Sequence, residues 1–335
     1  MTHQMPAVLL IALFCITGTG HAAEPSAPLV PERTIALKGV TGRIDHLAVD
    51  LARKRLFVAE LGNGTVDVID LAADNVTRRI EGLKEPQGLA YAPAADILAV
   101  ASAGDGSVRL FHGAELSPAG TVDLGDDADN IRLDARTGNI VVGYGSGGLA
   151  VIDPAKASLL TRIPLPAHPE GFQLDPAGRR AFVNVPDARQ VAVVDMNAGR
   201  QTANWRFSDD LRANFPMALD ASQGMAAVVF RNPARFVTFD MNTGKPISMV
   251  TTCGDADDVF LDAKRRRVYV SCGDGSLDTW QQDGSAYRRL TILKTAAGAR
   301  TSLFVPGLDR LFVAARAGSF GLGSDAAILV LRPAD

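Results

Sequence analysis

The chain repeats one unit, and this repeat constrains its fold more than any other feature. Each unit is a short apolar strand, a charged turn, a second apolar strand, a Gly-rich turn and a third strand ending near Asp, as in IDHLAVD-LARKR-LFVAE-LGNGT-VDVID from Ile44. The first strands of successive units close at residues spaced 43, 41, 41, 45, 42 and 44 apart, namely Asp50, Pro93, Asp134, Asp175, Asp220, Asp262 and Pro306. A period near 43 residues with short strands is that of a propeller blade. We therefore predict an all-β fold, a single seven-bladed β-propeller of four-stranded blades.

The two ends of the chain predict how the ring closes. The last unit supplies only three strands, TSLFV, RLFVAAR and AILVLR, before the chain ends. The segment from Arg33 to Leu37 is a strand without a place in the first unit. We expect this N-terminal strand to complete the last blade, which hides the strand edges between the first and last blades.

The second strands LFVAE, AFVNV, VYVSC and LFVAA resemble the YVTN-type repeat. On these residues the chain resembles the YncE-like group of secreted seven-bladed propellers over roughly residues 33–333. The tetrad Tyr-Val-Thr-Asn does not occur literally in the sequence, and the resemblance implies an architecture without a catalytic set. No catalytic residue is carried over from it.

The N-terminal segment predicts export. Residues Ala7 to Ile16 read AVLLIALFCI, and small residues follow up to Ala23. We predict a signal peptide over residues 1–23 and a propeller over residues 24–335, which makes the mature protein periplasmic or secreted. Residues 1–23 contain no Lys or Arg, unlike most signal peptides. An uncleaved anchor and a lipoprotein attached through Cys15 are the alternatives.

Charge and apolar content limit the classes of partner that the chain could bind. The chain has 34 Lys+Arg against 37 Asp+Glu and no basic block, which disfavours nucleic acid as a partner. No apolar run approaches the length of a membrane span, so we expect none after signal cleavage. A closed ring has no need of a second copy, so we expect a monomer. Walker, GxSxG, HExxH and CxxCH motifs do not occur in the sequence.

The loops on the two faces of the ring differ in pattern. Turns between third and fourth strands repeat one another (DLAADN, DPAKAS, DMNAGR, DMNTGK) and are expected to be structural. Loops that lead into the first strands do not repeat, as an asymmetric ligand requires, and we place the site on this face, called the mouth face below. The predicted ligand-binding residues are Asp45, His46, Gln87, Asp129, Asn130, His168, Glu170, Asn214, Arg231, Asp257, Asp258 and Arg300.

The charges of this set allow several occupants. Carboxylates gathered at a mouth repel unless they are protonated, paired with Arg or bridged by a cation. A divalent cation in the central channel is one hypothesis, with Asp45, His46, Asp129, Glu170 and Asp257 as ligands. Rim arginines such as Arg231 and Arg300 either bind an anionic ligand or pair with these carboxylates. A polar channel that holds only water is the simplest alternative.

Two cysteines remain after the predicted cleavage, Cys253 and Cys272. One precedes the first strand of the sixth unit and the other ends its second strand, so both reach the mouth face in adjacent strands. A disulfide fits this placement and an exported protein. Free thiols and a metal or redox role are the alternatives.

Two functions follow from these observations. The first is an exported, non-catalytic binding module that recognises an envelope protein, a glycan or a small polar ligand on the mouth face. The second is a metal-assisted hydrolase or lactonase whose channel carboxylates hold the cation. Exposed aromatic residues are scarce on this face, which favours a polar ligand over an apolar protein partner.

Overall fold

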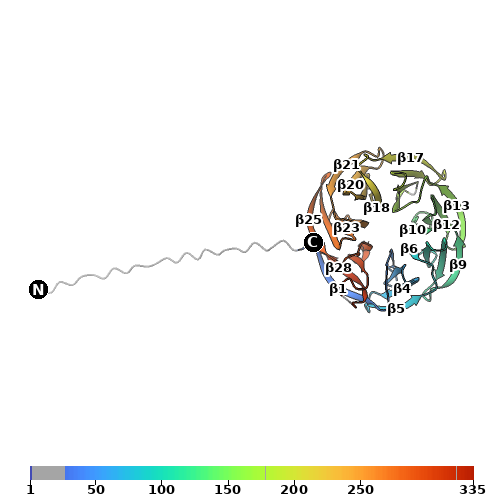
Figure 1. Ribbon diagram of the computed structural model, residues 1–335, viewed down its shortest axis with the longest axis horizontal. Helices are drawn as coiled ribbons and strands as arrows, with labels where there is room; N and C mark the ends of the chain where they lie inside the picture. Colours follow the sequence, from blue (N-terminus) through green and yellow to red (C-terminus); the bar gives the residue numbers. More distant parts are fainter. Residues whose placement is uncertain (2–26, 178, 322) are drawn as a thin grey trace.

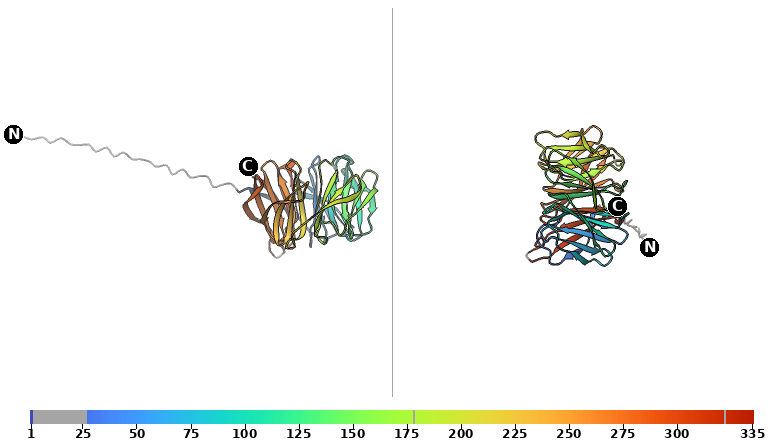
Figure 2. Two further views of the ribbon diagram at one scale, coloured as in Figure 1. Left: turned by 90° about the horizontal axis from the view of Figure 1, so that it is seen from above. Right: turned by 90° about the vertical axis from the view of Figure 1, so that its right-hand side faces the viewer.

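The computed structural model describes residues 1, 27–177, 179–321 and 323–335. Its described part forms 28 strands and one 3₁₀ helix, η1 (Pro306–Leu308), arranged as seven four-stranded antiparallel sheets around a ring (Figure 1). Edge-on, the ring is a disc (Figure 2). This confirms the predicted all-β, seven-bladed propeller. The predicted signal peptide lies, apart from Met1, outside the described residues.

The first four blades follow one another along the chain, each running from the channel outward. Their strands are β2 (Leu47–Asp50), β3 (Arg55–Glu60), β4 (Thr65–Asp70) and β5 (Asn75–Ile80); β6 (Pro86–Ala92), β7 (Ile97–Ser102), β8 (Ser107–His112) and β9 (Ser117–Asp123); β10 (Ala128–Leu133), β11 (Ile140–Tyr144), β12 (Gly148–Asp153) and β13 (Ser158–Pro164); β14 (Phe172–Leu174), β15 (Arg180–Val185), β16 (Gln190–Asp195) and β17 (Arg200–Arg206).

The remaining three blades continue in the same order, with the outer strand of the seventh taken from the N-terminal part of the chain. Their strands are β18 (Arg212–Asp220), β19 (Met225–Asn232), β20 (Ala234–Asp240) and β21 (Pro246–Thr251); β22 (Ala256–Asp262), β23 (Arg267–Cys272), β24 (Ser276–Asp283) and β25 (Ala286–Lys294); β26 (Ser302–Val305), β27 (Arg310–Ala315), β28 (Ala326–Pro333) and β1 (Leu29–Leu37).

The burial of each strand depends on its place in the blade. Second strands such as β3 are buried on both faces, with Leu56, Phe57 and Val58 all fully buried, because each blade packs between two others. This explains why the second strands read as continuous apolar runs instead of alternating. Outer strands such as β9 expose most of their residues. First strands of neighbouring blades contact one another around the whole ring, including β26 with β2.

Asp residues terminate the third strands on the face opposite the mouth. The carboxylate of Asp195 accepts hydrogen bonds from the N–H groups of Asn197 and Ala198, both at 2.9 Å. The same turn recurs at Asp70, Asp153 and Asp240. One local solution reused in this way is the structural role predicted for these turns.

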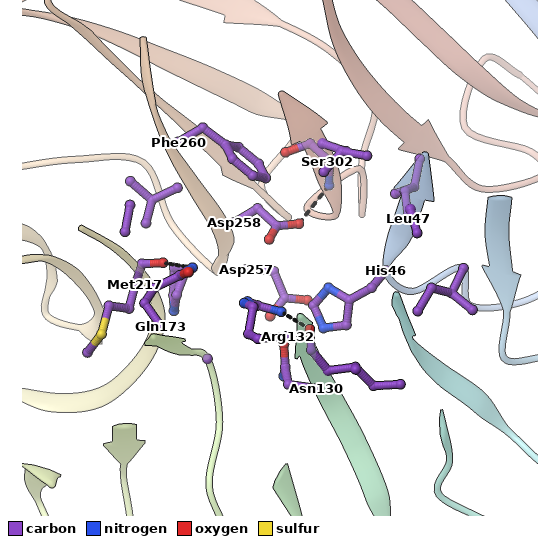
Figure 3. A pocket seen from close by; sticks show the side chains of 18 of the residues that line it. His46, Leu47, Asn130, Arg132, Gln173, Met217, Asp257, Asp258, Phe260 and Ser302 are labelled. Carbon is purple, nitrogen blue, oxygen red and sulfur yellow. Dashed lines mark hydrogen bonds between the residues drawn. The ribbon is translucent and has the colours of Figure 1, made fainter. Parts of the chain in front are cut away.

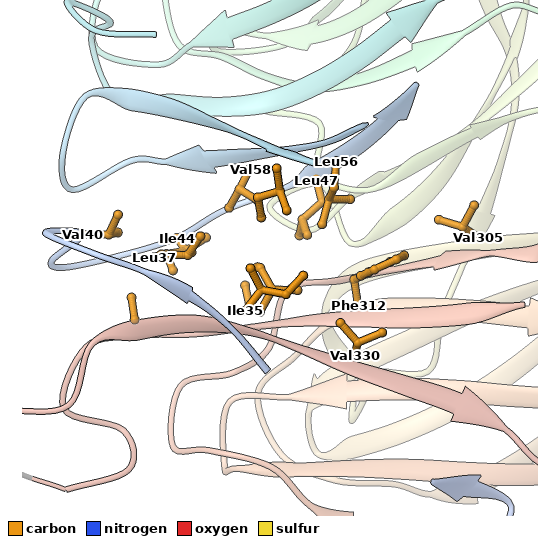
Figure 4. Packing of buried hydrophobic residues seen from close by; sticks show 14 residues of the cluster. Ile35, Leu37, Val40, Ile44, Leu47, Leu56, Val58, Val305, Phe312 and Val330 are labelled. Atoms are coloured by element: carbon orange, nitrogen blue, oxygen red, sulfur yellow. The ribbon is translucent and has the colours of Figure 1, made fainter. Parts of the chain in front are cut away.

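The N-terminal strand closes the ring, as predicted. β1 pairs antiparallel with β28, with Ile35 opposite Ile328 and Leu37 opposite Ala326. Ile35 and Leu37 are buried in one cluster with Phe312 of the same blade and Leu56 of the next (Figure 4). The strand therefore both completes the seventh blade and fills its contact with the first. Among the described residues, no helix is long and apolar enough to cross a membrane.

A disulfide joins Cys253 and Cys272 in the sixth blade, with their α-carbons 5.9 Å apart. It links the segment before β22 to the end of β23. The carboxylate of the buried Asp278 accepts hydrogen bonds from the backbone N–H of Cys253 and from the Arg289 guanidinium. Together these bonds hold the loop that leads to Asp257 and Asp258 at the mouth.

Replacing Ile35 by Ala is expected to lower the free energy of unfolding by about 3 kcal/mol, because the side chain is buried at the ring closure. Urea denaturation of the full chain measures this. Thr34→Ala, on the exposed side of the same strand, serves as control and is expected to change stability by less than about 0.5 kcal/mol. Equal effects of the two substitutions would contradict the proposed closure.

Removal of the disulfide in a Cys253→Ala, Cys272→Ala double variant is expected to cost about 3 kcal/mol, because the bond closes a loop with a sequence separation of 19. A reductant should lower the stability of the wild-type protein by a similar amount and leave that of the double variant unchanged. A reductant that destabilises both proteins equally would show that its effect does not come from this bond.

Candidate functional site

A cavity of about 470 Å³ lies in the channel, lined by first-strand residues of all seven blades (Figure 3). Its volume suits a small molecule. Seven predicted site residues line it: Asp45, His46, Asp129, Asn130, Glu170, Asp257 and Asp258.

The register of first and second strands divides the cavity into layers. Asp45, Asp129, Glu170 and Asp257 lie where the first strands begin and form a charged mouth layer. Deeper lies a middle layer of one residue per blade, each paired with the equivalent residue of its second strand: Ala48, Ala90, Arg132, Gln173, Ala218, Phe260 and Leu303. Apolar residues such as Leu133, Leu219 and Leu261 form the floor.

Glycines bring neighbouring first strands together at the mouth. A Cβ atom on Gly88 would lie 2.0 Å from the carbonyl oxygen of Asp129, and one on Gly171 would lie 2.5 Å from the carbonyl oxygen of Phe215. Both approaches exclude any side chain at these two positions. The close contact fixes the backbone from which Asp129 and Phe215 project.

Asp45 and His46 form the mouth on the first blade. Arg43 pairs with Asp45 at 2.7 Å, and the His46 Nε2 atom lies 3.7 Å from the same carboxylate. Burial raises the pKa of Asp45 to about 6, although His46 and Arg43 oppose the shift. Burial lowers the pKa of His46, but the charges of Asp45 and Asp258 outweigh this and raise it above its ordinary value.

Two arginines neutralise Asp257 on the sixth blade. Arg231 donates a short hydrogen bond to Asp257, and the Arg300 Nε atom lies 2.9 Å from its other carboxylate oxygen. Arg300 also binds Asp255 at 3.0 Å. The Arg231 guanidinium lies 3.7 Å from the ring centroid of Phe215. These rim arginines thus pair with carboxylates, the second of the two roles considered from the sequence.

Glu170 and Asp258 have no cation within ion-pair distance among the described residues. Burial raises the pKa of Glu170 to about 7, and the charge of Asp129 adds to the shift. Burial also raises the pKa of Asp258 to about 7, although Asp258 accepts a 2.7 Å hydrogen bond from the backbone N–H of Ser302. Such carboxyl groups titrate near neutral pH and are typical of functional sites.

His168 and Gln87 do not line the cavity but contact residues at its mouth. The His168 Nδ1–H donates to the carbonyl oxygen of Gly145 at 2.6 Å, so its Nε2 atom faces Asp129 at 3.7 Å. The interaction with Asp129 raises the pKa of His168 to about 9. Gln87 lies 3.5 Å from both Arg43 and Asp127.

Asn214 is not at the channel, contrary to its placement from the sequence. It is fully buried and donates hydrogen bonds to the Asn184 side chain at 2.9 Å and to the Gln190 carbonyl oxygen at 3.0 Å. Asn214 lies opposite Phe230 as Ala128 lies opposite Tyr144 and Ala256 opposite Cys272. It therefore stands one residue before the mouth level, which Phe215 occupies in this blade.

The side chains proposed to bind a cation do not form a common binding site. In the described part of the chain, no three His, Cys, Asp or Glu side chains are grouped as metal ligands. Arg43 neutralises Asp45, and Arg231 and Arg300 neutralise Asp257. The donor set therefore does not fit the divalent cation considered from the sequence.

The middle layer, above all Arg132, was not predicted from the sequence. This residue lies in β10 and lines the cavity (Figure 3), where the charges of Asp258 and Asp129 act on its guanidinium. Gln173 and Phe260 share its layer. A signal was present: the segment IRLD carries a charged residue inside a first strand, where other units have an uncharged one.

Comparisons with known proteins support the fold and leave the family open. No family model matches the chain, and no curated protein matches it. Among solved structures, a chain of the hydrazine synthase of Kuenenia stuttgartiensis is similar, with a TM-score of 0.76 over 94% of this chain and 99% of that chain. The two share 15% sequence identity, so the likeness concerns the fold alone. The resemblance to the YncE-like group stays a prediction.

Replacing Asp258 by Asn is expected to change the pH dependence of stability. A carboxyl in an unfolded chain has a pKa near 3.9, so the raised folded-state pKa of about 7 makes wild-type stability fall as the pH rises from about 4 to 7. The variant lacks this loss, which amounts to at most about 1.4 kcal/mol per pH unit. Its stability relative to wild type should therefore increase between pH 4.5 and 7.5, as measured by urea denaturation.

The matched control is Asp283→Asn, an exposed carboxylate at the far end of β24. Its stability relative to wild type should stay constant over the same pH range. A constant difference for Asp258→Asn as well would contradict the raised pKa.

Proposed function

We propose that this protein is an exported, non-catalytic binding module that holds a small polar ligand in the mouth of the propeller channel. The observation that carries the proposal is a set of polar groups that line the cavity without partners. The half-buried side chain of Glu170 makes no hydrogen bond or ion pair among the described residues, and the buried Oδ1 atom of Asn130 has no hydrogen-bond partner among them. A buried acceptor such as this Oδ1 atom normally has a partner, so a ligand or water completes it.

The orientation of Asn130 supports a ligand at this position. Its Nδ2 group donates toward Asp129 at 3.4 Å, which leaves the Oδ1 atom as the free acceptor. Asn130 itself is 3% exposed and lines the cavity. A site with fixed, unfilled acceptors is preorganised for a ligand that donates hydrogen bonds.

The surroundings favour binding over hydrolysis. A metal-assisted hydrolase needs a cation held by several ligands, and two of the four mouth carboxylates, Asp45 and Asp257, instead have arginine partners. The fold itself is compatible with both functions. The disulfide and the apolar N-terminal segment of the sequence support the exported location that forms part of this proposal.

Native mass spectrometry of the mature protein, purified without chelator, tests the proposal first. A thermal-shift panel of free amino acids, alkylamines, carboxylates and neutral sugars follows. We expect at least one class to raise the melting temperature, because a ligand that binds only the folded state stabilises it. A bare polypeptide mass together with no shift from any class would overturn the proposal.

Glu170→Gln is expected to weaken binding of the responding compound by about tenfold or more, because a hydrogen bond to a charged group contributes about 1.5–3 kcal/mol. Isothermal titration calorimetry measures the change. Asp283→Asn removes the same charge on the opposite face and should leave the affinity unchanged. Equal affinities of wild type and Glu170→Gln would place the ligand elsewhere.

A further inference from the structure

The middle layer of the cavity contains a single charged residue. Of its seven residues, four are aliphatic and one is Phe260, and besides Gln173 only Arg132 is polar. Alanines at positions 48, 90 and 218 leave room in this layer. The positive charge of Arg132 therefore faces open space within the channel, below a mouth dominated by carboxylates.

Arg132 makes no ion pair among the described residues, although the charges of Asp258 and Asp129 act on its guanidinium from a longer distance. No carboxylate of the described residues lies within ion-pair distance of its guanidinium, in contrast to Arg43, Arg231 and Arg300. Its Nη1 atom donates to the carbonyl oxygen of Ile131 at 2.7 Å, and its guanidinium lies 5.5 Å from the ring centroid of Phe172. Several guanidinium N–H groups remain for an outside acceptor, and a planar carboxylate matches their geometry.

Glu170 is the group of opposite charge to Arg132 and lies at the mouth. It begins the fourth blade at the level of Asp129, since Phe172 and Ile131 pair with equivalent valines of their second strands. The backbone of Arg132 lies three residues deeper in β10 than this level, about 10 Å in an extended strand. Glu170 and Asn130 supply free acceptors above, and Arg132 supplies free donors below.

We propose that the ligand is a small zwitterion that enters with its carboxylate inward. Its carboxylate binds the guanidinium of Arg132, and its ammonium group donates hydrogen bonds to Glu170 and to the Oδ1 atom of Asn130. This assignment rests on the proposed binding function and adds the chemical class and the orientation. Each end of such a ligand meets a charged group that has no ion pair among the described residues, which removes the cost of leaving a charge unpaired.

A series of ω-amino acids with one to six methylene groups tests the assignment. Calorimetry on the mature protein compares each compound with the alkylamine and the alkyl carboxylate of equal length. We expect the zwitterions to bind at least tenfold more tightly than either singly charged compound, with a maximum at one chain length. Zwitterions that bind no better than alkylamines would overturn the assignment.

Two substitutions separate the ends of the ligand. Arg132→Gln should reduce the affinity of the best zwitterion at least tenfold and leave that of the matched alkylamine unchanged. Glu170→Gln should weaken both. Arg288→Gln, which removes an exposed arginine of β25, is the matched control and should change neither affinity. Thermal denaturation checks the fold of each variant, and Arg132→Met provides a second test if Arg132→Gln is unstable.

The outcomes distinguish this inference from the proposed function. If sugars or amines bind the channel and zwitterions do not, the binding function stands and the zwitterion assignment fails. If the zwitterion binds equally well to Arg132→Gln and to wild type, the inner anchor is wrong. If no compound of either panel binds, both proposals fail.

Discussion

The pairing of β1 with β28 is the interaction on which the rest of the structure depends. It supplies the missing strand of the last blade and buries Ile35 and Leu37 against the first blade. Without it the ring has two open edges, and the first strands no longer surround a common axis. The channel exists because the two ends of the chain meet, and the site residues lie on, or a few residues before, strands that this closure positions.

Electrostatics within the channel follow from an uneven distribution of partners. Four carboxylates lie at the mouth. Arginines neutralise two of them, Asp45 and Asp257. Glu170, Asp258 and Arg132 remain outside these pairs. Groups of opposite sign at different depths, none of them in an ion pair among the described residues, create a field along the channel axis. A ligand with separated charges is the molecule that such a field binds best.

The candidate site was predictable in part, and the failures have physical causes. The sequence identified the four mouth carboxylates because each stands at the start of a first strand, and first strands surround the channel in a propeller. These residues are Asp45, Asp129, Glu170 and Asp257. Asn214 was misplaced by one residue, since it is equivalent to Ala128 in pairing and Phe215 occupies the mouth level, and the repeat pattern does not fix a strand start to one residue. Arg132 was missed because a charged residue in a strand resembles many solvent-facing residues until the channel around it is known.

The sequence by itself determined the architecture, since a period near 43 residues and strand-length apolar runs leave few folds that bury seven such units. It also determined the ring closure and identified the face whose loops differ from blade to blade. The tertiary structure alone decided the pairing of charges: Arg231 with Asp257, Arg43 with Asp45, and Arg132 with no carboxylate of the described residues within ion-pair distance. The repeat sets where each backbone lies, whereas partner choice depends on side chains from different blades meeting within a few ångströms, a distance that periodicity does not encode.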